Sequence, residues 1–257
     1  MALLKVRGLT KTFGGLDAVK ELNFDLNKGE ILGIIGPNGA GKSTVFNMIC
    51  GTYKPTSGTL VFQGEDITGL PPHQIAKRGI ARLFQGNVLF RNFTVIKNVL
   101  IGLHLHTQLG LFGFLFGGPA VHRREEVLHA KAMEILQLVG LADEADRTAS
   151  SQPHGNQRLV CLAIALAAEP KLLLLDEPVT GMNAQEVSGM LAVIEKLRKE
   201  QGITSIVVEH NMKAVMGLCD RIVTISYGKK IAEGTPKKIA SNTAVIEAYL
   251  GAEQDAS

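Results

Sequence analysis

The residues from Gly36 to Thr44 have the types and the spacing that bind phosphate groups. They read GPNGAGKST and match the pattern G-x-x-x-x-G-K-[ST]. An apolar run that predicts a buried strand, Glu30 to Ile35, precedes them, and a helical run, Ser43 to Cys50, follows. Glycines let the backbone curl so that several N–H groups face the phosphate oxygens, and the helix adds its dipole. We therefore predict a phosphate-binding loop, or P-loop, made of Gly36, Pro37, Asn38, Gly39, Ala40, Gly41, Lys42, Ser43 and Thr44.

Two residues of this loop and two carboxylates predict a reaction on the bound phosphates. Lys42 would reach the β- and γ-phosphates as a positive charge, and the Ser43 hydroxyl would coordinate Mg²⁺. The run KLLLLDEP, Lys171 to Pro178, predicts a buried strand that ends in Asp176 and Glu177, at the edge where open α/β sheets bind ligands. Asp176 would hold Mg²⁺, and Glu177 would polarise the attacking water as general base. The predicted reaction is phosphoryl transfer to water.

The composition limits the class of protein. The 257 residues suffice for a sizeable core, which excludes a disordered chain and a small disulfide-held fold. The net charge is +3, too small to favour a nucleic-acid partner. Cys50, Cys161 and Cys219 lack metal-ligand spacing and are interpreted as reduced core residues of a cytosolic protein. The most apolar runs, Leu109 to Gly118 and Leu159 to Ala168, are too short to cross a bilayer, so any membrane role would be peripheral.

The order of predicted elements indicates an α/β fold of the P-loop NTPase type. Short strands at 3–7, 21–26 and 59–63 predict an N-terminal antiparallel β subdomain. Beyond residue 158, helices and buried strands alternate, which predicts a mostly parallel sheet covered on both faces. The first of these helices is expected to start at Leu159. Amphipathic segments predict an inserted helical subdomain, 89–158, so that 1–88 and 159–257 form the core of a single domain, 1–257.

These motifs resemble those of the ABC-type ATPase family, and the resemblance covers nearly the whole chain. Gln85 in ARLFQGN resembles the family's Q-loop glutamine, which implies contact with the metal and water. His210 in VVEHNMK resembles the switch histidine, which implies a hydrogen bond to the γ-phosphate. Phe13 in TKTFGG matches the aromatic residue that stacks on adenine. The resemblance implies ATP and Mg²⁺ as ligands, with Ser43, Gln85 and Asp176 at the metal and Glu177, His210 and Gln85 as catalytic residues.

The segment that corresponds to the family's signature departs from the usual pattern. The family commonly has Leu-Ser-Gly-Gly-Gln, whereas this chain reads QPHGNQ from Gln152 to Gln157. In the family this segment binds the γ-phosphate of ATP held by the other subunit, so the resemblance implies that Gly155 contacts ATP in trans. Pro153 removes a hydroxyl and an N–H at the serine position. Two interpretations stay open, a full ATPase and an ATP-binding regulatory partner that hydrolyses weakly.

Several stretches resemble one branch, the ATP-binding subunits of bacterial branched-chain amino acid importers. They include GGLDAVKELNF, VEHNMKAVMGLCDRI, YGKKIAEGTP and an apolar insertion at 107–120. The resemblance implies two membrane-spanning permeases and a second ABC ATPase, with a homodimer as the form expected in isolation. It also implies, indirectly, an extracytoplasmic amino-acid-binding protein and a peripheral location on the cytoplasmic face of the inner (plasma) membrane. Another cargo, such as amides, urea or a lipid, and a soluble non-transport ABC ATPase are the alternatives.

Overall fold

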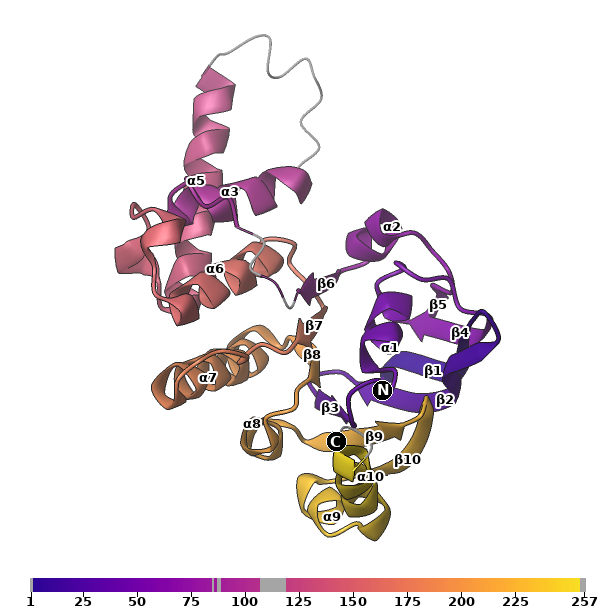
Figure 1. The fold of residues 1–257 in the computed structure, drawn as a ribbon. Coiled ribbons are helices and arrows are strands. Elements are labelled where there is room, and N and C mark those ends of the chain that lie inside the picture. The colour runs from indigo at the N-terminus through magenta and orange to yellow at the C-terminus, as the bar shows by residue number, and fades with distance from the viewer. Residues whose placement is uncertain (1, 85, 87–88, 107–118, 255–257) are drawn as a thin grey trace. The chain divides into compact units, whose positions relative to one another are not determined.

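The computed structural model describes residues 2–84, 86, 89–106 and 119–254 (Figure 1). The chain divides into two compact units. One, which we call the core unit, comprises 1–82, 171–178 and 198–257, and the other, the helical unit, comprises 83–170 and 179–197. The boundaries inferred from the sequence, with a helical subdomain at 89–158, stay a prediction.

The core unit contains two sheets, an antiparallel one of order β2-β1-β4-β5 and a larger one of order β10-β9-β3-β8-β7-β6 (Figure 1). In the larger sheet β3, β7, β8 and β9 run parallel, whereas β10 pairs antiparallel with β9. The strands are β1 (Ala2–Phe13), β2 (Leu16–Asn27), β3 (Ile31–Ile35), β4 (Ser57–Phe62), β5 (Glu65–Asp66), β6 (Ile80–Leu83), β7 (Leu172–Asp176), β8 (Thr204–Val208), β9 (Arg221–Ser226) and β10 (Lys229–Gly234).

Helices follow or connect these strands. In the core unit they are α1 (Lys42–Ile49), α2 (Pro72–Lys77), α8 (Met212–Leu218), α9 (Pro236–Ala240) and α10 (Thr243–Gln254). The helical unit contains α3 (Val95–His106), α5 (Pro119–Val139), α6 (His154–Leu166) and most of α7 (Ala184–Gln201), together with the short 3₁₀ helices η1 (Ala142–Glu144) and η2 (Ala149–Ser151). Within it α3, α5 and α6 pack against one another.

The central strands confirm the predicted α/β class. Every residue of β3, β7 and β8 is buried, which fits their continuous apolar sequences because parallel strands are covered on both faces. The expectation that a helix starts at Leu159 was wrong, because α6 starts at His154. Pro153 is its N-cap with φ −52° and ψ 156°, and proline is well tolerated at a helix start since it lacks an N–H to satisfy. The β9–β10 hairpin was not predicted.

The cysteines are free thiols, as predicted. Cys161 and Cys219 are buried and Cys50 is half-buried. Burial raises the pKa of Cys219 to about 12 and the pKa of Cys50 to about 11. Both groups therefore stay protonated thiols with low reactivity at neutral pH.

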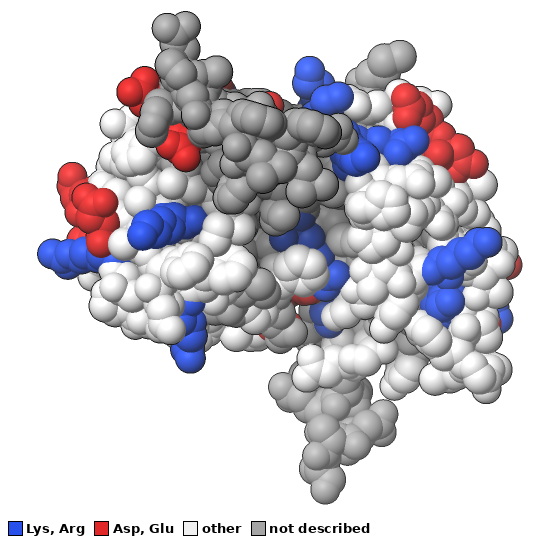
Figure 2. Space-filling view, turned by 90° about the horizontal axis from the view of Figure 1, so that it is seen from above, with Lys and Arg blue, Asp and Glu red and all other residues white. Residues whose placement is uncertain are grey.

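On the face that Figure 2 shows, charged side chains of the described residues do not gather in one patch. In the view of Figure 2 the described Lys and Arg side chains lie in several separate places, several of them beside Asp and Glu side chains. None of the described helices has the length and apolar character needed to cross a membrane.

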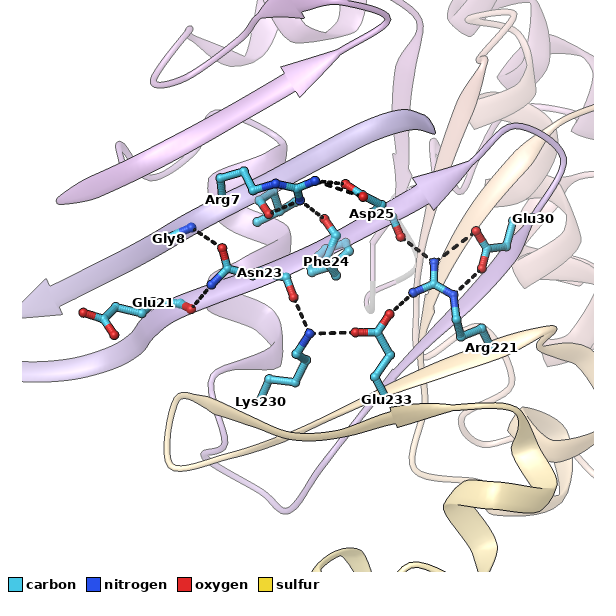
Figure 3. Close-up of polar contacts among 11 residues, drawn as sticks. Arg7, Gly8, Glu21, Asn23, Phe24, Asp25, Glu30, Arg221, Lys230 and Glu233 are labelled. Carbon is cyan, nitrogen blue, oxygen red and sulfur yellow. Dashed lines mark hydrogen bonds and ion pairs between the residues drawn. The ribbon is translucent and has the colours of Figure 1, made fainter. Parts of the chain in front are cut away.

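A polar network joins the β9–β10 hairpin to β2 (Figure 3). The Arg221 guanidinium donates to both carboxylate oxygens of Glu30, at 2.8 and 3.1 Å, and also to Glu233 and to the backbone carbonyl of Asp25. Lys230 extends the network, since its Nζ donates to Glu233 Oε2 at 2.6 Å. The paired carboxylates balance the buried part of the guanidinium charge, so the network fastens β9 and β10 against the antiparallel sheet.

We expect Arg221→Met to lower the free energy of unfolding by about 2–4 kcal/mol, because it leaves the Glu30 carboxylate, whose side chain is only 10% exposed, without this partner. Arg7→Met is the matched control. Arg7 pairs with Asp25 where both side chains are more than 40% exposed, and such pairs contribute about 0–1 kcal/mol. Urea unfolding of both variants tests this, and equal losses would contradict the role assigned to Arg221.

Candidate active site

The phosphate-binding loop lies tightly between two strands of the core unit. A Cβ atom at Gly36 would lie 2.0 Å from the carbonyl oxygen of Ile225 in β9. A Cβ atom at Gly41 would lie 2.3 Å from the carbonyl oxygen of Ala18 in β2, and Gly41 has φ +102°. Both positions therefore require glycine for two reasons, the close approach of another backbone and the conformation.

Lys42 is held over this loop at the start of α1. Its Nζ donates to the carbonyl oxygens of Gly36 at 2.7 Å and Pro37 at 2.8 Å. Burial lowers the pKa of Lys42, and the nearby carboxylates of Glu177 and Asp176 oppose that shift. The first turn of α1 contains no acidic residue, so its N–H groups and dipole favour a bound anion.

We expect Gly36→Ala to weaken ATP binding by at least about 100-fold and to cost about 3 kcal/mol of stability, because the new Cβ must displace β9 or the loop. Gly64→Ala is the control, since φ is +88° there but no heavy atom lies within 4 Å of the added Cβ. It should cost about 1 kcal/mol from backbone strain alone and leave ATP affinity unchanged. Fluorescent-nucleotide titration and thermal unfolding measure both effects, and equal losses of affinity would contradict the argument.

The two carboxylates at the end of β7, Asp176 as its last residue and Glu177 directly after it, differ in their surroundings. Asp176 is buried, and the Nη2 of Arg82 donates to its Oδ2 at 2.5 Å. Glu177 has φ +49°, a strained value for this residue type, and its N–H donates to the carbonyl oxygen of Val208 at 2.8 Å. The two neighbouring carboxylates thus have different environments. Asp176 is buried and paired with a cation, whereas Glu177 is partly exposed.

His210 lies beside Glu177, in the turn that follows the neighbouring strand β8. Its Nδ1 is 3.8 Å from Glu177 Oε1, and its side chain is 62% exposed. The turn that carries it is fixed by Glu209, whose Oε2 accepts from the N–H groups of His210 at 3.1 Å and Asn211 at 3.2 Å. Asn211 Oδ1 in turn caps α8 by accepting from the N–H of Ala214 at 3.1 Å. The structure therefore brings His210 and Glu177 together at the carboxyl edge of the parallel strands.

Phe13 lies at the end of β1 with a second aromatic residue, Tyr53. The two rings meet edge to face, with centroids 5.3 Å apart and an interplanar angle of 76°. The Nζ of Lys11 is 5.0 Å from the Phe13 centroid, within the range of a cation–π contact. Tyr53 was not predicted as part of the site, because it lies far from Phe13 in the sequence and no motif surrounds it.

The residues of the atypical signature segment make well-formed contacts in the helical unit. Gln152 is buried, its Nε2 donates to Glu144 Oε2 at 2.8 Å, and its Oε1 accepts from Asn156 Nδ2 at 2.9 Å. The Gly155 N–H donates to Glu186 Oε1 at 3.1 Å, and a Cβ atom there would lie 2.7 Å from that oxygen. The polar residues at this position are thus satisfied, and the start of α6 keeps its helical geometry.

Some predicted residues are not placed. Gln85 lies outside the described residues, as do positions 107–118 of the apolar insertion. Arg82, which contacts Asp176, was missed. Its one signal in the sequence is that it is the only charged residue among four, Ile80 to Leu83, of which the other three are apolar.

The chemistry of the donors fits a magnesium ion that is bound together with a nucleotide. Ser43 and Asp176 supply a hydroxyl and a carboxylate, and Mg²⁺ in such sites needs only one or two protein oxygens besides phosphate and water. Among the described residues no cluster of three or more His, Cys, Asp or Glu could hold a metal ion.

The strand, glycine-rich loop, helix and adjacent carboxylates define a P-loop nucleoside triphosphatase. The family model of the ABC transporter matches residues 19–180, and that of the branched-chain amino acid ATP-binding cassette transporter matches 229–255. The high-affinity branched-chain amino acid transport ATP-binding protein BraF of Pseudomonas aeruginosa is 42% identical over 249 residues, which cover 97% of this chain and 98% of BraF. The chain belongs to the ABC transporter family and is an ATP-binding, ATP-hydrolysing subunit of a transporter.

Solved structures agree with this assignment. The ADP conformation of MJ1267, an ATP-binding cassette of an ABC transporter, aligns with a TM-score of 0.86 at 32% identity and covers 98% of this chain and 99% of MJ1267. A dimeric post-hydrolysis state of the ATP-binding cassette MJ0796, bound to ADP and Pi, aligns with a TM-score of 0.75 at 26% identity, covering 91% of this chain and 98% of that one.

Proposed function

We propose that this chain hydrolyses ATP to drive the import of branched-chain amino acids through a membrane complex. The observation that carries the proposal is the match of residues 229–255 to the branched-chain amino acid model, because that model describes one branch of a family with many cargoes. The name of BraF supports the same cargo over nearly the whole length. The segment includes β10, α9 and α10 of the core unit.

The residues of the site would have separate roles in ATP hydrolysis. The loop N–H groups and Lys42 bind and orient the phosphates. Ser43, Asp176 and Gln85 would hold Mg²⁺, which supplies neutralisation of charge on the phosphates when it is bound. Glu177 accepts a proton from the attacking water, and His210, whose Nδ1 is 3.8 Å from the Glu177 carboxylate, donates a hydrogen bond to the γ-phosphate. Phe13 and Tyr53 form the aromatic face for adenine.

A second ABC ATPase subunit completes the site. Gly155 belongs to the helical unit, and the start of α6 around Gly155 would contact the γ-phosphate of ATP held by that other subunit. The dimeric structure of MJ0796 supports such a pair. We expect a heterodimer in the transporter and a homodimer of the isolated chain. ATP binding then closes the pair and hydrolysis lets it open.

The satisfied contacts of Gln152 favour a full ATPase over a weakly hydrolysing regulatory partner. An unpaired polar group in this buried position would disturb the start of α6, whereas Gln152 has partners at both ends of its amide. The remaining partners are two membrane-spanning permeases and, indirectly, an extracytoplasmic amino-acid-binding protein. The chain would then lie on the cytoplasmic face of the inner membrane as a peripheral subunit.

Purification of the tagged chain from detergent-solubilised membranes tests the proposal. We expect two multi-spanning proteins and a different ABC ATPase to copurify in defined proportions. A parallel purification of an unrelated tagged protein controls for carry-over of membrane proteins. Recovery of the chain without membrane proteins would overturn the transport assignment and favour a soluble ABC ATPase.

A further inference from the structure

Arg82 is a largely buried cation beside the candidate metal ligand Asp176. Its Nη2 donates to Asp176 Oδ2 at 2.5 Å, and the two side chains are only 11% and 7% exposed. Its Nη1 donates to Asn47 Oδ1 at 2.7 Å, and its guanidinium carbon lies 5.7 Å from the ring centroid of Phe46. Asn47 and Phe46 belong to α1, the helix that follows the P-loop, so one side chain joins α1 to the end of β7.

The surroundings of Arg82 make the charge pair strong. Cys50, also at the end of α1, interacts with the guanidinium, but burial raises its thiol pKa to about 11, so it stays neutral. The neutral Cys50 thiol therefore does not compete with the Asp176 carboxylate for the positive charge of Arg82. A buried carboxylate that loses such a partner is strongly destabilised unless another cation replaces it.

We propose that Arg82 is the counter-ion of Asp176 while no metal ion is bound, and that Mg²⁺ arriving with ATP competes with Arg82 for this carboxylate. The inference rests on the role proposed above for Asp176. Two cations on one buried carboxylate repel each other, so each weakens the hold of the other. Arg82 is thus a positioning residue that keeps Asp176 charged and in place, at the cost of some affinity for the metal.

The position of Arg82 gives this competition a consequence for the chain. Arg82 is the last residue of the core unit, and Leu83, the next residue of β6, is the first of the helical unit. If Mg²⁺ displaced Arg82 from Asp176, β6 would lose this side-chain link to β7 at the point where the chain leaves the core unit, while the two strands stay neighbours in the sheet.

The test compares the affinities of purified full-length variants for Mg-ATP and for ATP in EDTA, measured by calorimetry in the Glu177→Gln background, which prevents turnover. We expect Arg82→Gln to bind Mg-ATP about tenfold more tightly than the background, and ATP in EDTA no more tightly. If the loss of a positive charge acted only through long-range attraction, Mg-ATP and ATP in EDTA would both bind more weakly. Tighter binding of Mg-ATP alone therefore reports on the competition at Asp176. Arg82→Met, which keeps an apolar stem near Phe46, is the second neutral variant if Arg82→Gln does not fold.

Three comparisons decide the outcome. Arg82→Lys should stay within about twofold of the background because it keeps the charge. Arg78→Gln, which removes a half-buried arginine paired with Glu65, should also change nothing. Unchanged or weaker Mg-ATP binding in the neutral Arg82 variants would overturn the inference, and so would an equal gain in Arg82→Lys. Asp176→Asn should abolish the preference for Mg-ATP and the gain; if the preference survives, the proposed role of Asp176 itself fails.

Discussion

Replacement of Glu177 by glutamine is expected to lower ATP turnover by at least about 100-fold while ATP binding persists. The amide keeps the size and the hydrogen-bonding atoms of the side chain but cannot accept the proton of the attacking water. The backbone N–H of residue 177 still donates to the carbonyl oxygen of Val208, so the chain path after β7 should not change. Lys42 and the loop, which bind the phosphates, are not altered.

Release of phosphate and binding of a fluorescent ATP analogue separate the two effects. Glu200→Gln, an exposed position near the end of α7, is the matched control and should keep normal turnover. Since hydrolysis is what allows the pair of subunits to part, the Glu177→Gln chain should also elute as an ATP-dependent dimer in gel filtration. Normal turnover in this variant would remove the general-base assignment.

Replacement of Lys42 by methionine is expected to weaken ATP binding by about 100-fold. A hydrogen bond to a charged group contributes about 1.5–3 kcal/mol, and Lys42 would make such bonds with the terminal phosphates. In the structure its Nζ donates hydrogen bonds to the carbonyl oxygens of Gly36 and Pro37, so the ammonium is already positioned over the loop. Burial lowers the pKa of Lys42, whereas the carboxylates of Glu177 and Asp176 favour its charged form.

The expected loss is one of affinity, in contrast to the loss of turnover in Glu177→Gln. Calorimetric titration with Mg-ATP measures it, and Lys77→Met, an exposed lysine at the end of α2, is the control. Thermal unfolding without nucleotide should be nearly unchanged, because the methionine keeps the apolar stem. An affinity within about threefold of the native chain would contradict the placement of the phosphates next to Lys42.

The elements around the P-loop could be predicted because their signals are local. The apolar run of β3, the glycine-rich loop and α1 adjoin in the sequence, and five apolar or small residues in a row, Ile31 to Ile35, are typical of a strand buried on both faces. The same reasoning found β7 with Asp176 and Glu177 at its end. Local periodicity therefore sufficed for the part of the site that one strand, one loop and one helix build.

The contacts that were missed depend on pairing between distant segments. Arg82 meets Asp176 because β6 lies next to β7 in the sheet, an order that no local pattern contains. The same holds for Phe13 and Tyr53, which meet through the fold alone. In the β9–β10 hairpin, Tyr227 has φ +46° in the turn, where asparagine or aspartate would have given a stronger turn signal.

The central claim is that the site around Lys42, Asp176 and Glu177 powers uptake of branched-chain amino acids. Uptake of radiolabelled leucine tests it most directly, in cells that lack this gene and carry either the native chain or the Glu177→Gln variant at equal levels in the membrane fraction. We predict that the native chain restores uptake and that the variant leaves it at the level of the deletion. Uptake restored by the variant, or uptake that does not depend on the gene at all, would contradict the claim.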